Sequence, residues 1–474
     1  MLKKLIATLA IVSLALTPIS QVNAAVKAGA ACPKAGNTAI SAGKTFTCIK
    51  SGKKLIWDKG GANDKSQKQS VVLPATPQLS EIDKFDNANM CQIGPDSSLD
   101  SFDMNQPNSG YTRSKTFLNS TGNLRFLVVY VDFLDVKMGK SSKQEIELVQ
   151  IPNLISKIDS MSYGKLKATF DIASETYLIS KNSISYKLNI DPHENAFPPG
   201  ADFAGLVKDI GNAVEPNYDM TKYDSMLIVY PVGAQIGITG VVSQPIVLDG
   251  KQFNQHIITN VVPTFDPNSR WLDKNWLLHE FGHTVGLPHP YPNSYMNESN
   301  GAYQIPAWSS MKFDDTFAPD YLGWEKYLLR WISDSQMYCL SDQINDKLTL
   351  YLDAIGNQSG NKKIAVIRIS RTEAIVIESR RKSAVDQLES ADEGVLVYRI
   401  DTLRKSDQEI VKVLTNNLTT RKFTNIYEHQ PAKTFTFLTG TLKNGDSVTT
   451  DGYRISVIQA DKSGDYISIQ KTNF

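Results

Sequence analysis

The sequence has little that would place this protein in a membrane or on a polyanion. Beyond its N-terminal residues, no apolar run approaches the roughly 18 residues that cross a bilayer as a helix. Charge of one sign is also missing, because 50 basic residues stand against 49 acidic ones. Without a strong net field, the chain has no general attraction for nucleic acid or for an anionic membrane. We therefore expect a mature protein with no membrane span and no nucleic-acid partner, and we assume a monomer.

The first 24 residues depart from this pattern. Lys3 and Lys4 precede a largely apolar run over residues 5–16, and small residues at 22–24 provide a signal-peptidase site. This arrangement predicts a secretory signal peptide of bacterial type over residues 1–24, cut after Ala24. The apolar run is short for a retained membrane anchor. We therefore expect a secreted, extracellular protein.

Cysteine is scarce, with four residues in the whole chain. In a secreted protein an even number of cysteines predicts disulfides. Cys32 and Cys48 lie in a block that is too small to be held together by its core alone, so we expect a local bridge between them. Cys91 and Cys339 remain, and a bridge between them would tie the start of the following region to its end.

Histidine is scarce too, with six residues, yet three of them lie in the stretch HEFGHTVGLPH over residues 279–289. On a helix, His279 and His283 lie on one face and can present two ring nitrogens to one zinc ion. Glu280 need not touch the metal and can take a proton from a water molecule that the zinc acidifies. Gly286 can adopt the left-handed conformation that ends a helix, so that the chain doubles back and delivers His289 as a third ligand.

An HExxH pentapeptide alone is a weak signal, because a histidine pair on an amphipathic helix is often only surface. The glycine and the third histidine complete the extended metzincin signature, HExxHxxGxxH, so the chain resembles that clan of zinc metallopeptidases. Over roughly residues 120–401 it also resembles the secreted bacterial peptidases of family M6, the immune inhibitor A group. That resemblance further includes MSYGKLKATFDI from Met161, YDSMLIVYP from Tyr223, APDYLGWEKYLLRWI from Ala318 and AIVIESRRKSAVDQLESADEGVLVYRID from Ala374. Many M6 members carry aspartate where this chain has His289, and the three-histidine pattern is that of the clan.

The resemblance to metzincins implies a methionine in a tight turn beneath the zinc, packed under the imidazoles. Met311 in WSSMKF is the first candidate for this Met-turn, and Met296 is the alternative. Met311 could also be an ordinary core methionine without a role at the metal. Some metzincins carry a tyrosine two residues past this methionine, but here the position is Phe313. We therefore expect no tyrosine ligand or oxyanion stabiliser from this turn; Tyr303 or His256 could serve instead, although a structural role suits each of them better.

Two further metal-binding roles are suggested by the chain. In some metzincins a propeptide cysteine binds the zinc of a latent precursor, which is a second reading of Cys91. The acidic residues Asp314, Asp315 and Asp320 offer oxygen ligands for a structural calcium ion, or else form a solvated acidic turn.

The elements ahead of the zinc motif predict a metzincin-like zincin domain within an α+β protein. Strands and helices alternate there, which matches a twisted mixed sheet with the long helices on one face. The resemblance to metzincins implies that substrate lies as an added strand along an exposed sheet edge, either Gly237–Val247 or Ile257–Val262. We expect strands at Leu124–Phe133, Leu166–Ile172 and Ser225–Tyr230, and helices at Lys143–Met161 and Ala204–Val214.

Beyond Cys339 the sequence changes to short alternating strands with turn signals, which predicts an antiparallel β-rich domain with a binding or supporting role. Glu378 and Asp401 lie in this part, where a buried ion pair explains each as well as a functional role does. We expect strands at Leu348–Leu352, Ile364–Ile369, Ala374–Glu378, Gly394–Ile400, Tyr453–Ile458 and Tyr466–Gln470.

The expected organisation has five parts. They are a signal peptide (1–24), a small basic module stapled by a disulfide (25–60), a linker (61–85), a zinc metallopeptidase domain (86–338) and the β-rich C-terminal domain (339–474). The charge of the basic module suits either a place near a cell wall or a solvated face.

Taken together, these residues predict a secreted endopeptidase with one catalytic zinc ion, acting on extracellular proteins or peptides with Glu280 as general base. The alternative is a catalytically inactive metzincin-like protein that binds extracellular protein or cell-wall material. A third reading is an adhesive protein that uses its basic module and its β-rich tail. A zinc hydrolase that cleaves a non-protein amide would carry the same residues.

Overall fold

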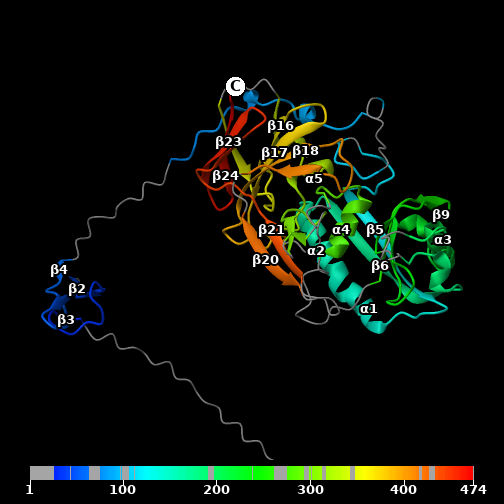
Figure 1. The fold of residues 1–474 in the computed structure, drawn as a ribbon, viewed down its shortest axis with the longest axis horizontal. Coiled ribbons are helices and arrows are strands. Elements are labelled where there is room, and N and C mark those ends of the chain that lie inside the picture. Colours follow the sequence, from blue (N-terminus) through cyan, green and yellow to red (C-terminus); the bar gives the residue numbers. More distant parts are fainter. Residues whose placement is uncertain are drawn as a thin grey trace, which may run out of the picture. The chain divides into compact units, whose positions relative to one another are not determined.

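The computed structural model describes residues 26–42, 44–62, 75–96, 98, 106–111, 113–189, 197–237, 239–260, 275–292, 298–299, 302–311, 317–341, 347–415, 419–425 and 433–472. The predicted signal peptide lies outside these residues. The chain divides into two compact units, Met1–Thr76 and Pro77–Phe474 (Figure 1). None of the helices within the described residues has the length and apolar character of a bilayer-crossing segment.

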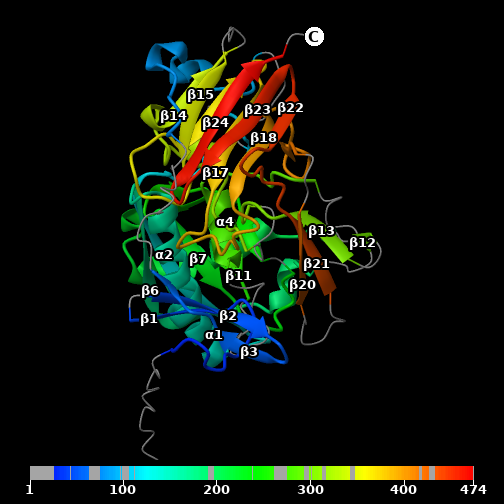
Figure 2. The same cartoon turned by 90° about the vertical axis from the view of Figure 1, so that its left-hand side faces the viewer.

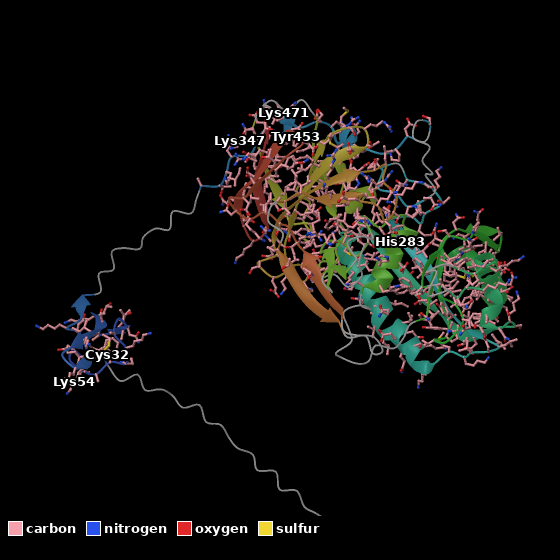
Figure 3. All side chains as sticks on the ribbon, in the orientation of Figure 1. Cys32, Lys54, His283, Lys347, Tyr453 and Lys471 are labelled. Carbon is pink, nitrogen blue, oxygen red and sulfur yellow. A yellow bond between two sulfur atoms is a disulfide. The ribbon has the colours of Figure 1, made fainter. Side chains whose placement is uncertain are left out.

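The first unit is a small antiparallel sheet held by one disulfide. Its strands are β1 (Thr38–Ser41), β2 (Lys44–Ser51), β3 (Lys54–Trp57) and β4 (Gly61–Ala62), with β2 pairing with the other three. The buried apolar residues are Cys32, Phe46 and Cys48, so the core is very small. Cys32 and Cys48 form a disulfide, which confirms the predicted local bridge (Figure 3).

The second unit begins with a five-stranded mixed sheet in the order β6-β5-β7-β11-β8. The strands are β5 (Gly122–Phe133), β6 (Leu166–Ile179), β7 (Ser225–Val229), β8 (Gly240–Val242) and β11 (His256–Thr259). β6, β5, β7 and β11 run parallel to one another, whereas β8 runs antiparallel to β11 at the edge. The predicted strands in this region are present, and β6 is longer than expected because it continues to Ile179.

Both faces of this sheet are buried. Along β5, Phe126 and Val128 belong to one apolar core, and Leu127 and Val129 belong to another. This alternation is the period of two that a strand imposes on its side chains. The sequence of β5 is almost continuously apolar because each face of the strand packs into a separate core.

The helices divide between these two faces. A helical segment with α1 (Lys140–Glu145), a π-helical stretch (Ile146–Gln150) and α2 (Ile151–Met161) covers one face together with α4 (Trp276–Thr284). The π-helical stretch ends just before Pro152, whose missing N–H interrupts the regular pattern. Helix α3 (Phe203–Val214) packs on the other face, so the expectation that the long helices share one face is wrong (Figure 1). The physical reason is its own apolar stripe, Leu206, Val207, Ile210 and Val214, which needs a second core.

The C-terminal strands form two sheets that pack face to face. One sheet has the order β14-β16-β17-β18-β19 and the other the order β15-β24-β23-β22, with an apolar core between them. The second sheet is antiparallel throughout, but β14 runs parallel to β16 in the first. The strands are β14 (Met337–Leu340), β15 (Leu348–Asp353), β16 (Ile364–Arg368), β17 (Glu373–Arg380), β18 (Gly394–Asp401), β19 (Val411–Val413), β22 (Ser447–Thr450), β23 (Tyr453–Ala460) and β24 (Gly464–Lys471).

The first of these sheets is covered on both sides. In β17, Ile375 and Ile377 face the sandwich core, while Ala374 and Val376 belong to the core that also contains α4 and α5 (Gly323–Leu328). Figure 2 shows β17 and β18 above α4, with β7 and β11 below it. One apolar core thus extends from the mixed sheet into the β-rich region. The predicted disulfide between Cys91 and Cys339 is present, and it ties the 3-10 helix Ala88–Cys91 to β14 of the β-rich region.

A further small sheet links the segment after residues 279–289 to the C-terminal region. Its order is β12-β13-β21-β20, and β13 (Ala302–Pro306) runs parallel to β21 (Lys433–Leu438). The other strands of this sheet are β12 (Glu298–Ser299) and β20 (Thr420–Asn425). The strands β9 (Ile246–Leu248) and β10 (Lys251–Phe253) form a separate two-stranded sheet. Short 3-10 helices lie at Ile82–Lys84, Ala88–Cys91, Ser183–Tyr186, Glu215–Asn217, Met220–Lys222 and Asp334–Gln336.

Candidate metal centre

Helix α4 carries the first two candidate ligands on its more exposed face. His279 and His283 are partly exposed, whereas Leu277, Leu278 and Phe281 are buried in the core. The buried apolar stripe fixes the rotation of the helix, and the spacing of four residues then places both imidazoles on the same side. Figure 3 labels His283 on this helix.

Gly286 ends the helix in the way that the sequence predicts. Its φ is +85°, and its N–H donates to the carbonyl of His283 at 2.8 Å. The N–H of Leu287 donates to the carbonyl of Gly282 at 2.9 Å, which completes a Schellman motif. A Cβ at Gly286 would also collide with the side chains of Arg113 and Phe117. The glycine is therefore needed both for its left-handed backbone and for its lack of a side chain.

The turn at Gly286 brings the third histidine to the other two. The Nε2 atoms of His279, His283 and His289 lie 3.1 Å from one another in all three pairs. Three nitrogens bound about 2.0–2.1 Å from one tetrahedral ion stand about 3.3 Å apart. The observed triangle is close to this spacing. Within the described residues, it is the one group of three His, Cys, Asp or Glu side chains whose ligand atoms all lie within 4.8 Å of one another.

Each histidine is held by a hydrogen bond on its other ring nitrogen. The Nδ1 of His279 lies 2.5 Å from the carbonyl oxygen of Ser310, and that of His283 lies 2.7 Å from the carbonyl oxygen of Leu287. The Nδ1 of His289 lies 3.1 Å from Oδ2 of Asp407. With an acceptor at each Nδ1, the ring proton belongs there and the Nε2 lone pair faces inward. Three converging lone pairs repel one another, and a bound cation would stabilise them.

The protonation of His283 agrees with this arrangement. Burial, together with the neighbouring His289, lowers the pKa of His283 to about 3. The ring is therefore neutral at ordinary pH, which is the form that binds a metal ion.

Glu280 lies beside the edge strand of the mixed sheet. Its side chain is buried, and its Oε2 lies 3.4 Å from where a Cβ of Gly240 would stand. Gly240 begins β8, and α4 contacts both β8 and β11. Of the two predicted edge segments, Gly237–Val247 therefore contains the edge strand, because β11 in the other segment is paired on both sides.

Met311 lies directly beneath the helix that carries the histidines. Its sulfur packs against the backbone of Gly282, where a Cβ would overlap it. The turn before it is tight, since Ser309 has a φ of +71° and its Oγ accepts a hydrogen bond from the N–H of Met311 at 3.1 Å. The same turn supplies the Ser310 carbonyl that faces His279. Met311 therefore packs under the helix that carries His279 and His283, while Met296 lies outside the described residues.

The other residues considered for the site lie apart from it or outside the description. His256 is completely buried on β11 and does not belong to the histidine group. The side chain of Tyr303 and the whole of Phe313 lie outside the described residues. Cys91 is bonded to Cys339, so the reading of Cys91 as a thiolate ligand of a latent zinc is wrong in this structure.

The acidic residues considered for calcium do not form a described site. Asp320 is buried, and its Oδ2 accepts a hydrogen bond from Nζ of Lys326 at 2.8 Å. Asp314 and Asp315 lie outside the described residues. No set of three carboxylates within the described ranges is close enough to share an ion. Asp320 is thus the partner of a buried lysine.

A cluster of buried charges lies behind the Met311 turn. Glu378 is fully buried, and it pairs with Nη1 of Arg380 at 3.0 Å. It also accepts a hydrogen bond from the N–H of Gly323. Glu378 is therefore part of a buried ion pair. Glu325 accepts hydrogen bonds from Ser309 Oγ at 2.7 Å and from the N–H of Leu322 at 2.8 Å. Burial raises the pKa of Glu325 to about 7. The hydrogen bond from Ser309 to Glu325 therefore connects the turn that carries Met311 to this cluster.

Asp401, the other acidic residue considered in the C-terminal region, has a local role. It is half-buried, pairs with Arg404 at 3.1 Å and accepts a hydrogen bond from the N–H of Leu403. It therefore orders the start of the loop between β18 and β19.

Sequence reasoning missed Asp407 and Ser406. Both come from that same loop, and Ser406 Oγ accepts a hydrogen bond from the N–H of His289 at 3.0 Å. They follow His289 by more than a hundred residues, and no local motif connects them with it. Only the folding of the C-terminal region against the zinc motif brings them together.

No protein-family model matches the sequence. A search of curated proteins found no similar one.

Proposed function

We propose that this chain is a secreted zinc-dependent endopeptidase of the metzincin type, similar to family M6, that hydrolyses peptide bonds in extracellular proteins. The observation that carries the proposal is the triangle of Nε2 atoms, 3.1 Å on each side, with every Nδ1 facing an acceptor. Three neutral imidazoles with a carboxylate beside them are the donor set of a catalytic zinc site in this clan.

His279, His283 and His289 would hold the ion and leave a fourth position for a water molecule. Zinc in such a site polarises a peptide carbonyl and acidifies the water. Glu280, which follows His279 along the helix, would act as general base and take a proton from the attacking water. The same carboxyl would then donate this proton to the leaving amine. Nucleophile, base and acid are thereby provided without a covalent enzyme intermediate.

The substrate is expected to lie along β8. This strand is the antiparallel edge of the sheet, and its Gly240 lies beside Glu280. A peptide added to β8 as a further strand would place its backbone next to the general base. The lack of a side chain at Gly240 leaves room for a peptide backbone to approach closely.

The supporting parts of the site agree with a metzincin-like arrangement. Met311 packs under the helix between the first two ligands, and the Ser310 carbonyl orients His279. The mixed sheet with one antiparallel edge strand lies against the same helix.

The proposal is tested by metal analysis of the purified secreted chain together with a peptide-library digest with and without a chelator. We expect one zinc ion per chain and cleavage that the chelator abolishes. Glu280→Ala should retain the zinc and lose turnover. Cleavage at normal rates by Glu280→Ala would remove this residue from the mechanism. Stoichiometric zinc with no digestion of any peptide would instead favour an inactive, binding relative.

A further inference from the structure

The loop between β18 and β19 forms several hydrogen bonds with His289, the third histidine of the triad. Ser406 Oγ accepts a hydrogen bond from the N–H of His289 at 3.0 Å, and the N–H of Asp407 donates to the carbonyl of His289 at 3.3 Å. The N–H of Val411, just past the loop, donates to the carbonyl of Pro290 at 2.9 Å. Asp407 Oδ2 lies 3.1 Å from the ring Nδ1 of the same histidine. The backbone and the ring of His289 are thus held from one loop.

This support differs from that of the other two ligands. His279 and His283 face the carbonyl oxygens of Ser310 and Leu287, which are neutral acceptors. The Nδ1 of His289 faces a carboxylate, that of Asp407. A carboxylate on Nδ1 fixes the tautomer and the orientation of a histidine and makes its Nε2 a stronger electron-pair donor.

The loop is built to hold Asp407 in place. Asp407 has a φ of +62°, a backbone conformation that a side-chain-bearing residue rarely adopts without compensation. Asp401 accepts a hydrogen bond from the N–H of Leu403 at 3.0 Å, and the side chain of Gln408 accepts one from the N–H of Lys405 at 2.8 Å. The loop therefore keeps its shape through its own bonds and through those to His289 and Pro290.

We infer that Asp407 is the positioning residue of the third ligand, and that the metal centre is completed by the β-rich C-terminal region. The inference rests on the proposed function, because it requires the triad to hold zinc. Residues 279–289 supply all three ligands, but the orientation of the last one depends on a residue far along the chain. Zinc affinity and the order of the β18–β19 loop are therefore coupled, each stabilising the other.

The competing explanation is a half-exposed ion pair with no effect on the metal. The side chains of His289 and Asp407 are 29% and 36% exposed, and pairs of this kind usually contribute little to stability. A purely structural pair would change unfolding slightly and leave zinc affinity unaltered. Zinc affinity is therefore the measurement that separates the two explanations.

The experiment measures zinc affinity of the full secreted chain by competition with a chromophoric chelator. We expect Asp407→Ala to bind zinc about 10–100-fold more weakly than the wild type. Asp407→Asn keeps an oxygen acceptor and should lose less. The matched control is Asp401→Asn, which loosens the same loop without touching the ring and should leave the affinity near that of the wild type.

Wild-type affinity in Asp407→Ala, or an equal loss in Asp401→Asn, would overturn the inference while leaving the proposed function in place. A wild-type chain that binds no zinc at all would overturn the proposed function, and the inference with it.

Trypsin provides a second readout that does not depend on activity. Arg404 and Lys405 are exposed in the loop and offer cleavage sites. In the Glu280→Ala background, which removes self-digestion, zinc should slow cleavage after these residues. In Glu280→Ala/Asp407→Ala the protection at the same zinc concentration should be much smaller. Equal protection in both proteins would show that the loop and the metal are independent.

Discussion

The sulfur of Met311 packs against the backbone of Gly282, the residue directly before the second histidine of the candidate metal centre. The glycine belongs to the HEFGH pentapeptide, in which this position is formally free, so the motif alone gives no reason for it. The structure supplies the reason, because any side chain there would occupy the space of the methionine. Tyr321 Oη, 2.8 Å from where the Cβ would stand, narrows that space further.

Gly282→Ala is therefore expected to destabilise the second unit. Overpacking of this kind costs about 1–3 kcal/mol of the free energy of unfolding, measured by urea denaturation of the metal-free protein. Met311→Ala alone should also destabilise, through the cavity that it leaves. In the double variant the new methyl group enters part of that cavity, so its loss should be smaller than the sum of the two single losses. Strictly additive losses would show that the two residues do not share this space.

Gly286→Ala should cost both stability and metal. A left-handed backbone costs an alanine about 1–2 kcal/mol, and the collision with Arg113 and Phe117 adds to this. Since the turn delivers the third ligand, zinc affinity should fall together with the free energy of unfolding. Gly360→Ala is the matched control, because its Cβ would meet no atom within 4 Å and its φ is not positive. Unchanged zinc affinity in Gly286→Ala would contradict this account of the turn.

The buried Glu325 should make the fold less stable as the pH rises. Burial raises its pKa to about 7 from an ordinary 4.5, so the folded chain binds this proton more tightly than the unfolded chain. Its stabilising contribution is complete below about pH 4.5 and is lost as the pH rises through about 7. A shift of this size corresponds to roughly 3 kcal/mol.

Glu325→Gln keeps an oxygen for Ser309 and Leu322 but cannot titrate. The difference in unfolding free energy between pH 5 and pH 8, measured on metal-free protein, should therefore shrink in this variant. Glu373→Gln, a half-buried glutamate paired with Arg399 at 3.0 Å, is the control and should keep the wild-type pH dependence. The idea fails if Glu325→Gln responds to pH as strongly as the wild type.

The disulfide between Cys91 and Cys339 closes a loop with a sequence separation of 248 residues. In the chain-entropy description a crosslink of that length stabilises by about 5 kcal/mol, chiefly by restricting the unfolded chain. Cys91→Ser/Cys339→Ser should therefore lower the thermal unfolding temperature of the second unit. Cys32→Ser/Cys48→Ser should affect the first unit and leave the second-unit transition in place, as followed by calorimetry. A shift of the same transition by the second pair would show that the two units unfold together.

The arrangement of the candidate metal centre was predictable from sequence as far as local geometry reaches. The three histidines, Glu280 and Gly286 lie within one helix and its capping turn, where spacing alone fixes the relative positions. Met311 was placed by resemblance to a clan, and the structure locates it beneath the helix. Asp407 was not predictable, because a contact across more than a hundred residues depends on how two sheets and a loop pack.

The same limit applies to the fold. Strands of the C-terminal region were identified to within a few residues, since turn signals and apolar alternation are local. The side of the sheet on which α3 packs, and the parallel pairing of β14 with β16, depend on long-range packing that no short window contains. Leu124–Phe133 was recognised as a buried strand, although its two separate partners were visible only in the structure.

The sheet containing β16, β17 and β18 supports the sandwich with one face and the helices around the metal centre with the other. A gene fragment that stopped near residue 338 would leave Trp324 and Tyr327 without the strands that keep them from water. Such a fragment should be recovered as aggregate, even though it contains His279, His283, His289 and Glu280. Attempts to shorten this protein should therefore remove residues at the ends of 77–474 and leave the interior of this range intact.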